Sequence, residues 1–505
     1  MAVFSKDQPI QHVFVLMLEN HSFDHLLGFS GIEGIDAETK QPTKINRLTG
    51  DDSNSFNGIT YKAQQPADWD MPVDPGHEFL DTLKQLCGPN VPFVKGQPYP
   101  AINNSGFVAD YVQSETAGEG NAPDNFGEIM KCFSPSQLPV LTTLAKEFAV
   151  CDHWFSSMPG PTWPNRFFLH TASSGGLDHS PTTDEIAEWE AIAGVRFANG
   201  SVFDRLNKYD DSWRIYRGDK FVSDAFPGVA ALKGIHIWDA HPISDFKSDL
   251  EGGYPWLYTF IEPSYGNILN NSYKGGTSQH PMDGIAGGEQ LIKETYEAIR
   301  NSALWEQSLL IILYDEHGGF YDHVVPPPAT APGDAIINPP SINKYGFDFT
   351  QYEVRVPAVI ISPFIPKNII DHRLYDHASV PATLEELFDL EPMTKRDAGA
   401  NHLHPLFSLT QPRNDTPTTL PNPAESGIAA SAIVPDTSQG SLAPANKGSL
   451  PGFLHAALRS ELKISPNKNR PAILKRFEKI KTQADAKKYM EKVQQKVQQY
   501  IVKKS

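Results

Sequence analysis

Two apolar runs, each ending abruptly in a polar cluster, constrain the fold of this 505-residue chain more than any other feature. One run extends from Val13 to Leu18 and the other from Leu309 to Leu313. Both are too short to cross a membrane as helices. Such runs are typical of strands buried on both faces, as in a parallel sheet covered by helices on each side. The sequence therefore predicts an α/β protein with a central, mostly parallel sheet flanked by helices.

The polar residues that follow these runs are of a kind that binds cations. Glu19 and Asn20 come directly after the first run, and Asp315 and Glu316 closely follow the second. Open α/β sheets bind their ligands at the carboxyl ends of strands, and carboxylate and amide oxygens suit hard divalent cations. The alternative is structural: a polar turn after the second strand, or a helix cap at Ser22 or Asn20 after the first.

A third segment places a hydroxyl at the start of a predicted helix. Prolines surround Thr162, and Pro164 suits the first turn of the apolar helix that follows. Because a helix N-terminus attracts anions, Thr162 could be held against a phosphate, with Asn165 and Arg166 as further donors. Equally, Thr162 could serve only as a helix cap.

Together, the three segments predict a phosphate-ester chemistry. A divalent metal at the strand ends would polarise a bound phosphate and lower the pKa of the Thr162 hydroxyl, making it a nucleophile. The attack would give a phosphothreonine intermediate, which water later hydrolyses. His77, His241 and His280 could contact the phosphoryl oxygens or protonate the leaving group, although a lone loop histidine is more often plain surface.

The three segments contain longer motifs, which read Glu19-Asn20-His21-Ser22-Phe23-Asp24-His25, Thr162-x-Pro164-Asn165-Arg166 and Asp315-Glu316-His317-Gly318-Gly319-Phe320-Tyr321-Asp322-His323. These motifs resemble those of the phosphoesterase family, over roughly residues 8 to 400. This family contains bacterial phosphatidylcholine-type phospholipases C, plant non-specific phospholipases C and the Francisella-type acid phosphatase.

The resemblance implies an alkaline-phosphatase-like fold and assigns roles to residues. The implied metal ligands are Glu19, Asn20, Asp315 and Glu316, with the nucleophile Thr162 as a further ligand. The implied phosphate-contacting histidines are His77, His280 and, less directly, His241. We expect Asn165 to bind substrate. For His317 three roles stay open: a substrate contact, support of the neighbouring ligands, or help in proton transfer.

The expected activity is that of a phospholipase C acting on phosphatidylcholine-type lipids. The alternatives are a broad acid phosphatase, and a non-catalytic phosphate- or lipid-binding protein on the same scaffold. The expected cofactor is one divalent ion, and Mg, Ca, Mn and Zn all remain compatible with the ligands. The expected partner is a phospholipid or another phosphate ester. A formal charge of −17 argues against nucleic acid.

Composition divides the chain into a catalytic domain (8–408), a Pro/Ser/Thr-rich linker or strap (409–450) and a basic helical segment (451–505). The last segment has 14 Lys and Arg against 4 Asp and Glu. It could contact a membrane peripherally, or pack on the acidic body. Glu19-Asn20-His21 follows the first apolar run where a cleavable signal would have small residues. We therefore expect a soluble protein, cytoplasmic or exported by a non-Sec route.

Overall fold

A ten-stranded sheet forms the centre of the protein, in the order β3-β2-β12-β6-β11-β10-β1-β9-β7-β8. The computed structural model describes residues 9–116, 126–192, 194–210, 212–270, 272–426, 442–446 and 448–504. The strands of this sheet are β1 (His12–Leu18), β2 (Glu33–Asp36), β3 (Pro42–Lys44), β6 (Ala149–Cys151), β7 (Trp213–Arg217), β8 (Ala240–Pro242), β9 (Tyr258–Ile261), β10 (Ser308–Tyr314), β11 (Ala358–Ile361) and β12 (Ile369–Asp371).

The two apolar runs lie side by side at the centre of this sheet. β1 pairs in parallel with both β9 and β10, and every residue of β1 and β10 is buried. The register opposes Leu18 to Tyr314, so the residues that follow the two strands emerge at the same edge. The predicted α/β class and mostly parallel sheet are thus confirmed. β11 is an exception, because it runs antiparallel to both of its neighbours.

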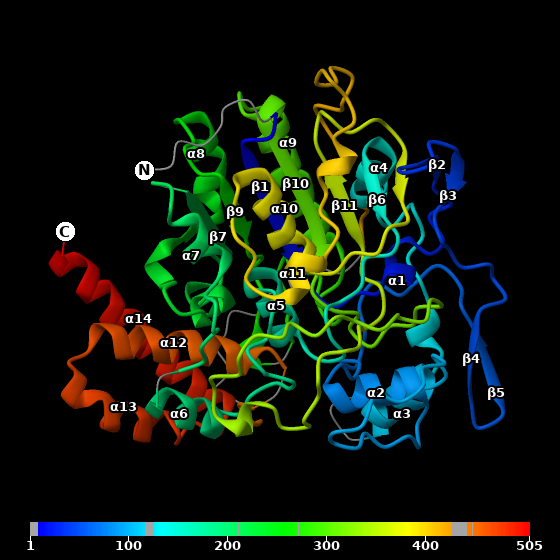
Figure 1. Ribbon diagram of the computed structural model, residues 1–505. Coiled ribbons are helices and arrows are strands. Elements are labelled where there is room, and N and C mark those ends of the chain that lie inside the picture. Colours follow the sequence, from blue (N-terminus) through cyan, green and yellow to red (C-terminus); the bar gives the residue numbers. More distant parts are fainter. Residues whose placement is uncertain are drawn as a thin grey trace.

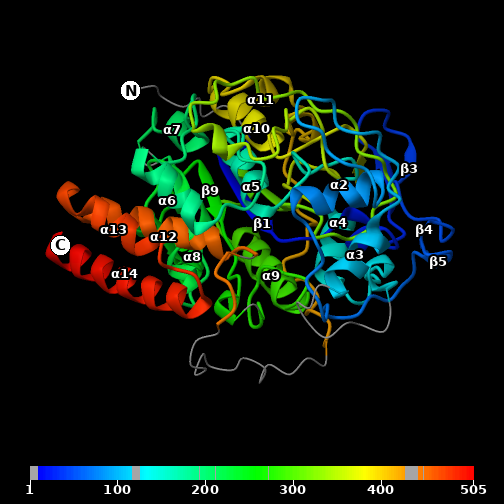
Figure 2. The same cartoon turned by 90° about the horizontal axis from the view of Figure 1, so that it is seen from below.

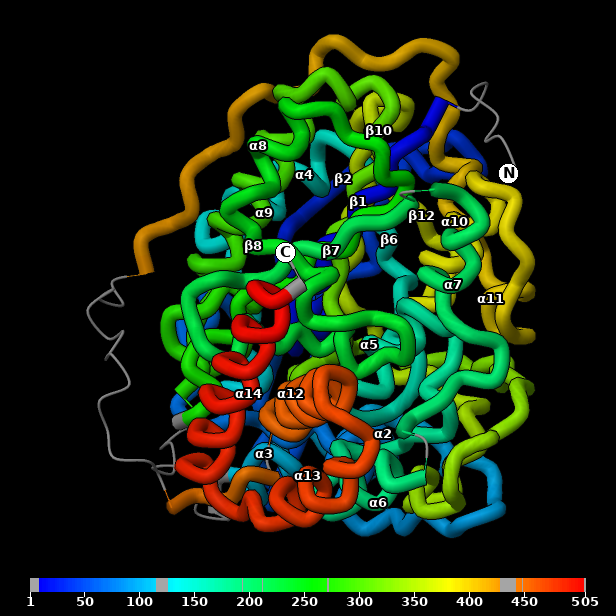
Figure 3. The backbone as a smooth tube through the Cα atoms, turned by 90° about the vertical axis from the view of Figure 1, so that its left-hand side faces the viewer, coloured from blue at the N-terminus to red at the C-terminus, as the bar shows by residue number. Residues whose placement is uncertain are grey.

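Helices cover both faces of the sheet, which explains why the central strands are apolar throughout (Figures 2 and 3). One face carries α4 (Pro139–Glu147), α8 (Phe246–Glu251) and α9 (Ala286–Arg300). The other carries α5 (Thr162–Thr171), α7 (Val202–Leu206), α10 (Ser379–Phe388) and α11 (Lys395–Gly399). α1 (Phe23–Leu27) directly follows the polar cluster of β1.

The region between residues 30 and 135 contains short elements with a small core of their own. They include the hairpin β4 (Ser53–Phe56) and β5 (Ile59–Lys62), and the helices α2 (Phe79–Cys87) and α3 (Phe107–Thr116). Their buried side chains form an apolar cluster separate from the main one. These elements therefore form a subdomain beside the sheet (Figure 1), whereas β2 and β3 of the same region belong to the central sheet.

The basic C-terminal segment packs against the body at one side of the molecule (Figure 1). It forms α12 (Leu450–Ile464), α13 (Arg470–Phe477) and α14 (Gln483–Lys504), and α13 lies against α6 (Thr183–Ile192). The predicted helical segment is not one continuous helix, because α13 ends at Phe477 and α14 begins only at Gln483. The break arises because Thr482 caps α14 by accepting a hydrogen bond from the Asp485 backbone.

The predicted linker lies against the body where it is described. Residues 416–420 bind the side chains of α9, and Leu420 is buried. Residues 427–441 and 447 lie outside the described residues, so the proposed domain boundaries stay predictions. In the described parts of the chain, no helix is both long and apolar enough to span a bilayer.

Candidate active site

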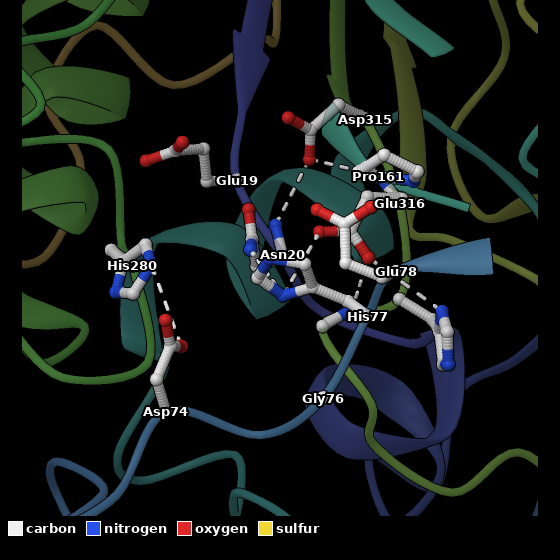
Figure 4. Close-up of polar contacts among 12 residues, drawn as sticks. Glu19, Asn20, Asp74, Gly76, His77, Glu78, Pro161, His280, Asp315 and Glu316 are labelled. Atoms are coloured by element: carbon white, nitrogen blue, oxygen red, sulfur yellow. Dashed lines mark hydrogen bonds and ion pairs between the residues drawn. The ribbon is translucent and has the colours of Figure 1, made fainter. Parts of the chain in front are cut away.

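The residues predicted to bind a metal lie at the carboxyl ends of β1 and β10 (Figure 4). Glu19, Asn20, Asp315 and Glu316 are all fully buried. The Asn20 backbone N–H donates to Asp315 Oδ1 at 3.0 Å, which ties the two strand ends together. Asn20 has a φ of 59°, a left-handed conformation that asparagine tolerates better than most residues.

Gly318 allows the turn after Glu316 to lie close to the end of β1. Its φ is 64°, and a Cβ atom at this position would lie 2.1 Å from the carbonyl oxygen of Asn20. A side chain would therefore push the turn after Glu316 away from β1.

Several buried oxygens of this cluster have no hydrogen-bond partner within the described residues. They are Glu19 Oε2, Asn20 Oδ1 and Glu316 Oε1. Burial, followed by the neighbouring Asp315, raises the pKa of Glu19 to about 8, and burial with Asp315 and Glu353 raises the pKa of Glu316 well above its usual range. A divalent cation would bind these oxygens and stabilise their charged forms, so the donor set fits a hard metal ion.

Glu316 also belongs to a second group of possible ligands, with His317 and Glu353. His317 Nδ1 lies 2.6 Å from Glu353 Oε1, and the other oxygen of Glu353 accepts from the Gly160 backbone. These atoms already have partners. Several oxygens at the strand ends lack such partners within the described residues, but Glu19, Asp315 and Glu316 do not bring one ligand atom each within 4.8 Å of one another, as Glu316, His317 and Glu353 do.

Thr162 is the first residue of α5 and is almost completely buried. Its loop is bound to Asp315 on both sides: Ser156 Oγ donates to the Asp315 carbonyl at 2.8 Å, and Arg166 Nε donates to Asp315 Oδ2 at 2.9 Å. Arg166 also donates to the carbonyl of Leu18, at the end of β1. The N-terminal turn of α5 is thus held against both strand ends.

His77 and His280 lie on the opposite side of the cluster from the strand ends (Figure 4). Asn20 Nδ2 donates to His77 Nδ1 at 3.2 Å, and Glu316 Oε1 lies 3.7 Å from the same nitrogen. Burial, with a smaller effect of His317, lowers the pKa of His77 to about 4. His280 stacks on Tyr273 with 3.4 Å between the ring centres.

Asp74 is a site residue that the sequence reasoning missed. Its Oδ1 lies 3.6 Å from His280 Nε2, and neither atom has a hydrogen-bond partner within the described residues. Burial raises the pKa of Asp74 to about 7. The available signal was a carboxylate three residues before His77 in Asp74-Pro75-Gly76-His77.

A polar cavity of about 430 Å³ lies on the side of Asp74 and His77, which both line it. Its walls come from α2, from the loops around His179 and Tyr345, and from residues just before α12. A larger cavity of about 530 Å³ lies between α8 and α9, but no predicted site residue lines it.

Three predicted residues are placed differently from the expectation. His241 is in β8, at the edge of the sheet and three strands from β1, or roughly 14 Å at the usual strand spacing. There it accepts a 2.7 Å hydrogen bond from Arg214, which keeps its ring away from the cluster. The structure therefore does not bring His241 into the site.

Asn165 and His317 are buried by contacts with the protein itself. The Asn165 side chain accepts from the Met158 N–H and donates to the carbonyls of Met158, Gly160 and Pro161. It therefore shapes the loop before Thr162, and its amide is not available to a substrate. His317 lies between Glu353 and Gln85, and is fully buried as well.

The C-terminal segment also reaches the cluster. Ser449, just before α12, donates from Oγ to Glu19 Oε1 at 3.2 Å, and its carbonyl accepts from Trp163 Nε1. No local pattern in the sequence around Ser449 indicates this contact.

Proteins similar in sequence to the chain include phospholipases C from a plant and from a bacterium. The chain is 35% identical to the non-specific phospholipase C3 of Arabidopsis thaliana, over 83% of its length and 77% of that protein. It is 27% identical to the phospholipase C B of Mycobacterium tuberculosis, over 82% of this chain and 80% of the other.

Solved structures that resemble the chain include a protein of the alkaline phosphatase superfamily from Vibrio parahaemolyticus. It is 13% identical, with a TM-score of 0.31, over 53% of this chain and 65% of the other. The sequence model of the Phosphoesterase family matches residues 10–391, which contain both strand ends and Thr162. The chain therefore belongs to the phosphoesterase family, and it is a hydrolase that acts on phosphate ester bonds.

Proposed function

We propose that the protein is a metal-dependent phospholipase C that cleaves phosphatidylcholine-type lipids through Thr162. The observation that carries the chemistry is the set of buried, unpartnered oxygens at the strand ends, beside the helix that begins with Thr162. The relatives named as phospholipases C support the lipid substrate.

In this proposal the metal ligands and Thr162 act on one side of the phosphate, and Asp74, His77 and His280 act on the other. One divalent ion held by Glu19, Asn20, Asp315, Glu316 and Thr162 would polarise the phosphate and acidify the hydroxyl of Thr162. Thr162 Oγ then forms a bond to phosphorus as the bond to the diacylglycerol oxygen breaks. The phosphorylated head group stays on Thr162 until water releases it.

The leaving diacylglycerol oxygen needs a proton, and we assign this step to the pair of Asp74 and His280. His280 Nδ1 accepts from the Met282 backbone, so Nε2 carries the ring proton and faces Asp74. Asp74, with a pKa of about 7, is protonated in a large fraction of molecules near neutral pH and can supply the proton. His77 would contact the phosphoryl oxygens from the cavity side.

We also propose a peripheral contact of the basic C-terminal segment with anionic lipid. Most of this segment packs on the body, through ion pairs such as Arg459 with Glu190 and Lys481 with Asp184. The end of α14 is exposed, with Ile501 and Val502 at 44% and 75% exposure. Apolar side chains among lysines are typical of a surface that binds lipid head groups.

The central test combines substrates, chelator and a nucleophile variant. Purified protein is assayed on phosphatidylcholine and on a soluble aryl phosphate, with and without EDTA, beside Thr162→Ala. We expect Thr162→Ala and EDTA each to lower phosphatidylcholine hydrolysis by a factor on the order of a thousand or more. Thr295→Ala is the matched control, since it removes a buried hydroxyl from α9.

The outcomes separate the candidate functions. Full activity in Thr162→Ala would contradict the threonine mechanism. Hydrolysis of the aryl phosphate without release of diacylglycerol would favour an acid phosphatase. Failure of the wild type on both substrates across a wide pH range would favour a binding protein.

A further inference from the structure

The buried side chain of His317 connects segments that are distant in the sequence. It follows Glu316 directly, and its two ring nitrogens contact different partners. Nδ1 lies 2.6 Å from Glu353 Oε1, and Nε2 lies 2.6 Å from Gln85 Oε1. Gln85 Nε2 already donates to two other oxygens, so Gln85 Oε1 is the acceptor toward His317.

Glu353 extends this contact to the loop that carries Thr162. Its Oε2 accepts from the Gly160 N–H at 2.7 Å, and its Oε1 accepts from the His317 backbone at 3.1 Å. Gly160 has a φ of 141°, which a residue with a side chain rarely adopts. Two backbone hydrogen bonds also join residues 353 and 354 to Ser156. The Glu353 carboxylate therefore fixes the backbone two residues before Thr162.

Gln85 extends the contact in the other direction, to the loop that carries His77. Gln85 Nε2 donates to the carbonyl of Gly76 at 2.6 Å and to Asp110 Oδ2 at 2.7 Å. Gly319 lies against the same loop, since a Cβ atom there would be 2.7 Å from the Gly76 carbonyl oxygen. The position of His77 therefore depends on Gln85 and on the turn that follows His317.

We propose that His317 is a positioning residue that sets the loops of Thr162, His77 and Glu316 relative to one another. This inference rests on the proposed function, because these loops carry the nucleophile, a phosphate contact and a metal ligand. His317 is buried behind Glu316, and all its ring contacts are with protein groups. Its effect on the reaction therefore passes through Glu353 and Gln85. Misplacement of a reacting group by about 1 Å can cost about a hundredfold in rate.

The main test is Glu353→Gln, which keeps the shape of the side chain. An amide has one acceptor oxygen, whereas Glu353 accepts from Gly160 through one oxygen and from His317 through the other. One of the two connections must therefore break. We expect kcat on phosphatidylcholine to fall between about tenfold and a hundredfold, while KM changes by less than about threefold and bound metal stays at the wild-type level.

Glu190→Gln is the matched control. Glu190 and His455 form another buried Glu–His pair, 2.9 Å apart, between α6 and α12 and outside the cluster. Its loss should cost stability and leave kcat unchanged. Gln85→Leu tests the other connection, since it removes the contacts to Gly76 and His317 without leaving a charge. It should lower kcat and also raise KM, because His77 is displaced.

Amide hydrogen exchange gives a readout that does not need activity. Exchange should rise at least tenfold in Glu353→Gln, in residues 158–162 if the contact with Gly160 breaks or in residues 316–319 if the contact with His317 breaks. Exchange in residues 76–78 should rise similarly in Gln85→Leu. None of these segments should change in Glu190→Gln. Wild-type kcat and exchange in Glu353→Gln and Gln85→Leu would overturn the positioning role. An inactive wild type would refute the proposed function, and the exchange data would still decide whether His317 orders the loops.

Discussion

His170, in the last turn of α5, is a buried histidine outside the reacting groups. Its ring lies edge-on to Phe260, with 4.6 Å between centres, and its Nδ1 has no hydrogen-bond partner within the described residues. Burial, with the nearby Arg166 second, lowers its pKa to about 3. Because the unfolded chain protonates this residue below pH 6.5, the folded state loses stability as pH falls from 6.5 toward 3.

The size of this effect can be measured by urea unfolding at several pH values. Between pH 7 and pH 5 the wild type should lose about 2 kcal/mol of unfolding free energy through His170 alone. His170→Phe should remove that part of the loss, and His404→Gln, at the surface, is the control substitution. If the unfolding free energy of wild type and His170→Phe depends on pH in the same way, His170 takes up its proton in the folded protein as readily as in the unfolded chain.

The site residues that the sequence predicts best are those that directly or closely follow an apolar strand. Glu19 and Asp315 emerge together because β1 and β10 pair in parallel, which the two apolar runs already indicate. Asp74 and Ser449 follow no strand. Their neighbours His280 and Glu19 are brought to them only by tertiary packing. His241 was predicted to contact the phosphate, but it lies in β8, the strand at the edge of the sheet.

At the scale of elements, α12 packs unusually closely on the start of α5. A Cβ atom on Gly452 would lie 1.9 Å from the indole of Trp163, the residue after Thr162. Gly452→Ala must therefore displace Trp163 or α12. We expect it to destabilise the fold by about 1–3 kcal/mol and to lower kcat. Thermal unfolding and steady-state kinetics on phosphatidylcholine measure the two effects.

Gly399→Ala is the control for this substitution, because no atom lies within 4 Å of its Cβ position. An unchanged melting temperature and kcat in Gly452→Ala would show that α12 can move without affecting α5. The sequence could not indicate this contact. Gly452 lies outside the residues that resemble the phosphoesterase family, and a glycine inside a helix can occur for many structural reasons. The sequence also could not predict that β11 runs antiparallel to β10, because its apolar residues suit a buried strand of either direction.

At the scale of the whole molecule, charge is distributed unevenly. The basic segment 451–505 lies on an otherwise acidic chain, and its helices gather at one side (Figure 1). Composition alone predicted the positive charge of this segment. It did not predict that buried Glu461 would form ion pairs with Arg476 and Lys496. Exposed lysines remain on α12, α13 and α14, such as Lys463, Lys475 and Lys488. We assign the proposed lipid contact to the outer face of α14, because this helix also ends in the exposed Ile501 and Val502.

The proposed lipid contact predicts that charge reversal on this face weakens binding to anionic vesicles. Lys488 and Lys492 are exposed and one helical turn apart on α14. Each lysine near an anionic surface contributes about 1 kcal/mol, so Lys488→Glu with Lys492→Glu should lower the partition coefficient at least about thirtyfold. Co-sedimentation with phosphatidylserine-containing vesicles measures it. Lys44→Glu with Lys62→Glu, on β3 and β5 at the opposite side, is the control, and equal binding by both double variants would rule out α14 as the contact.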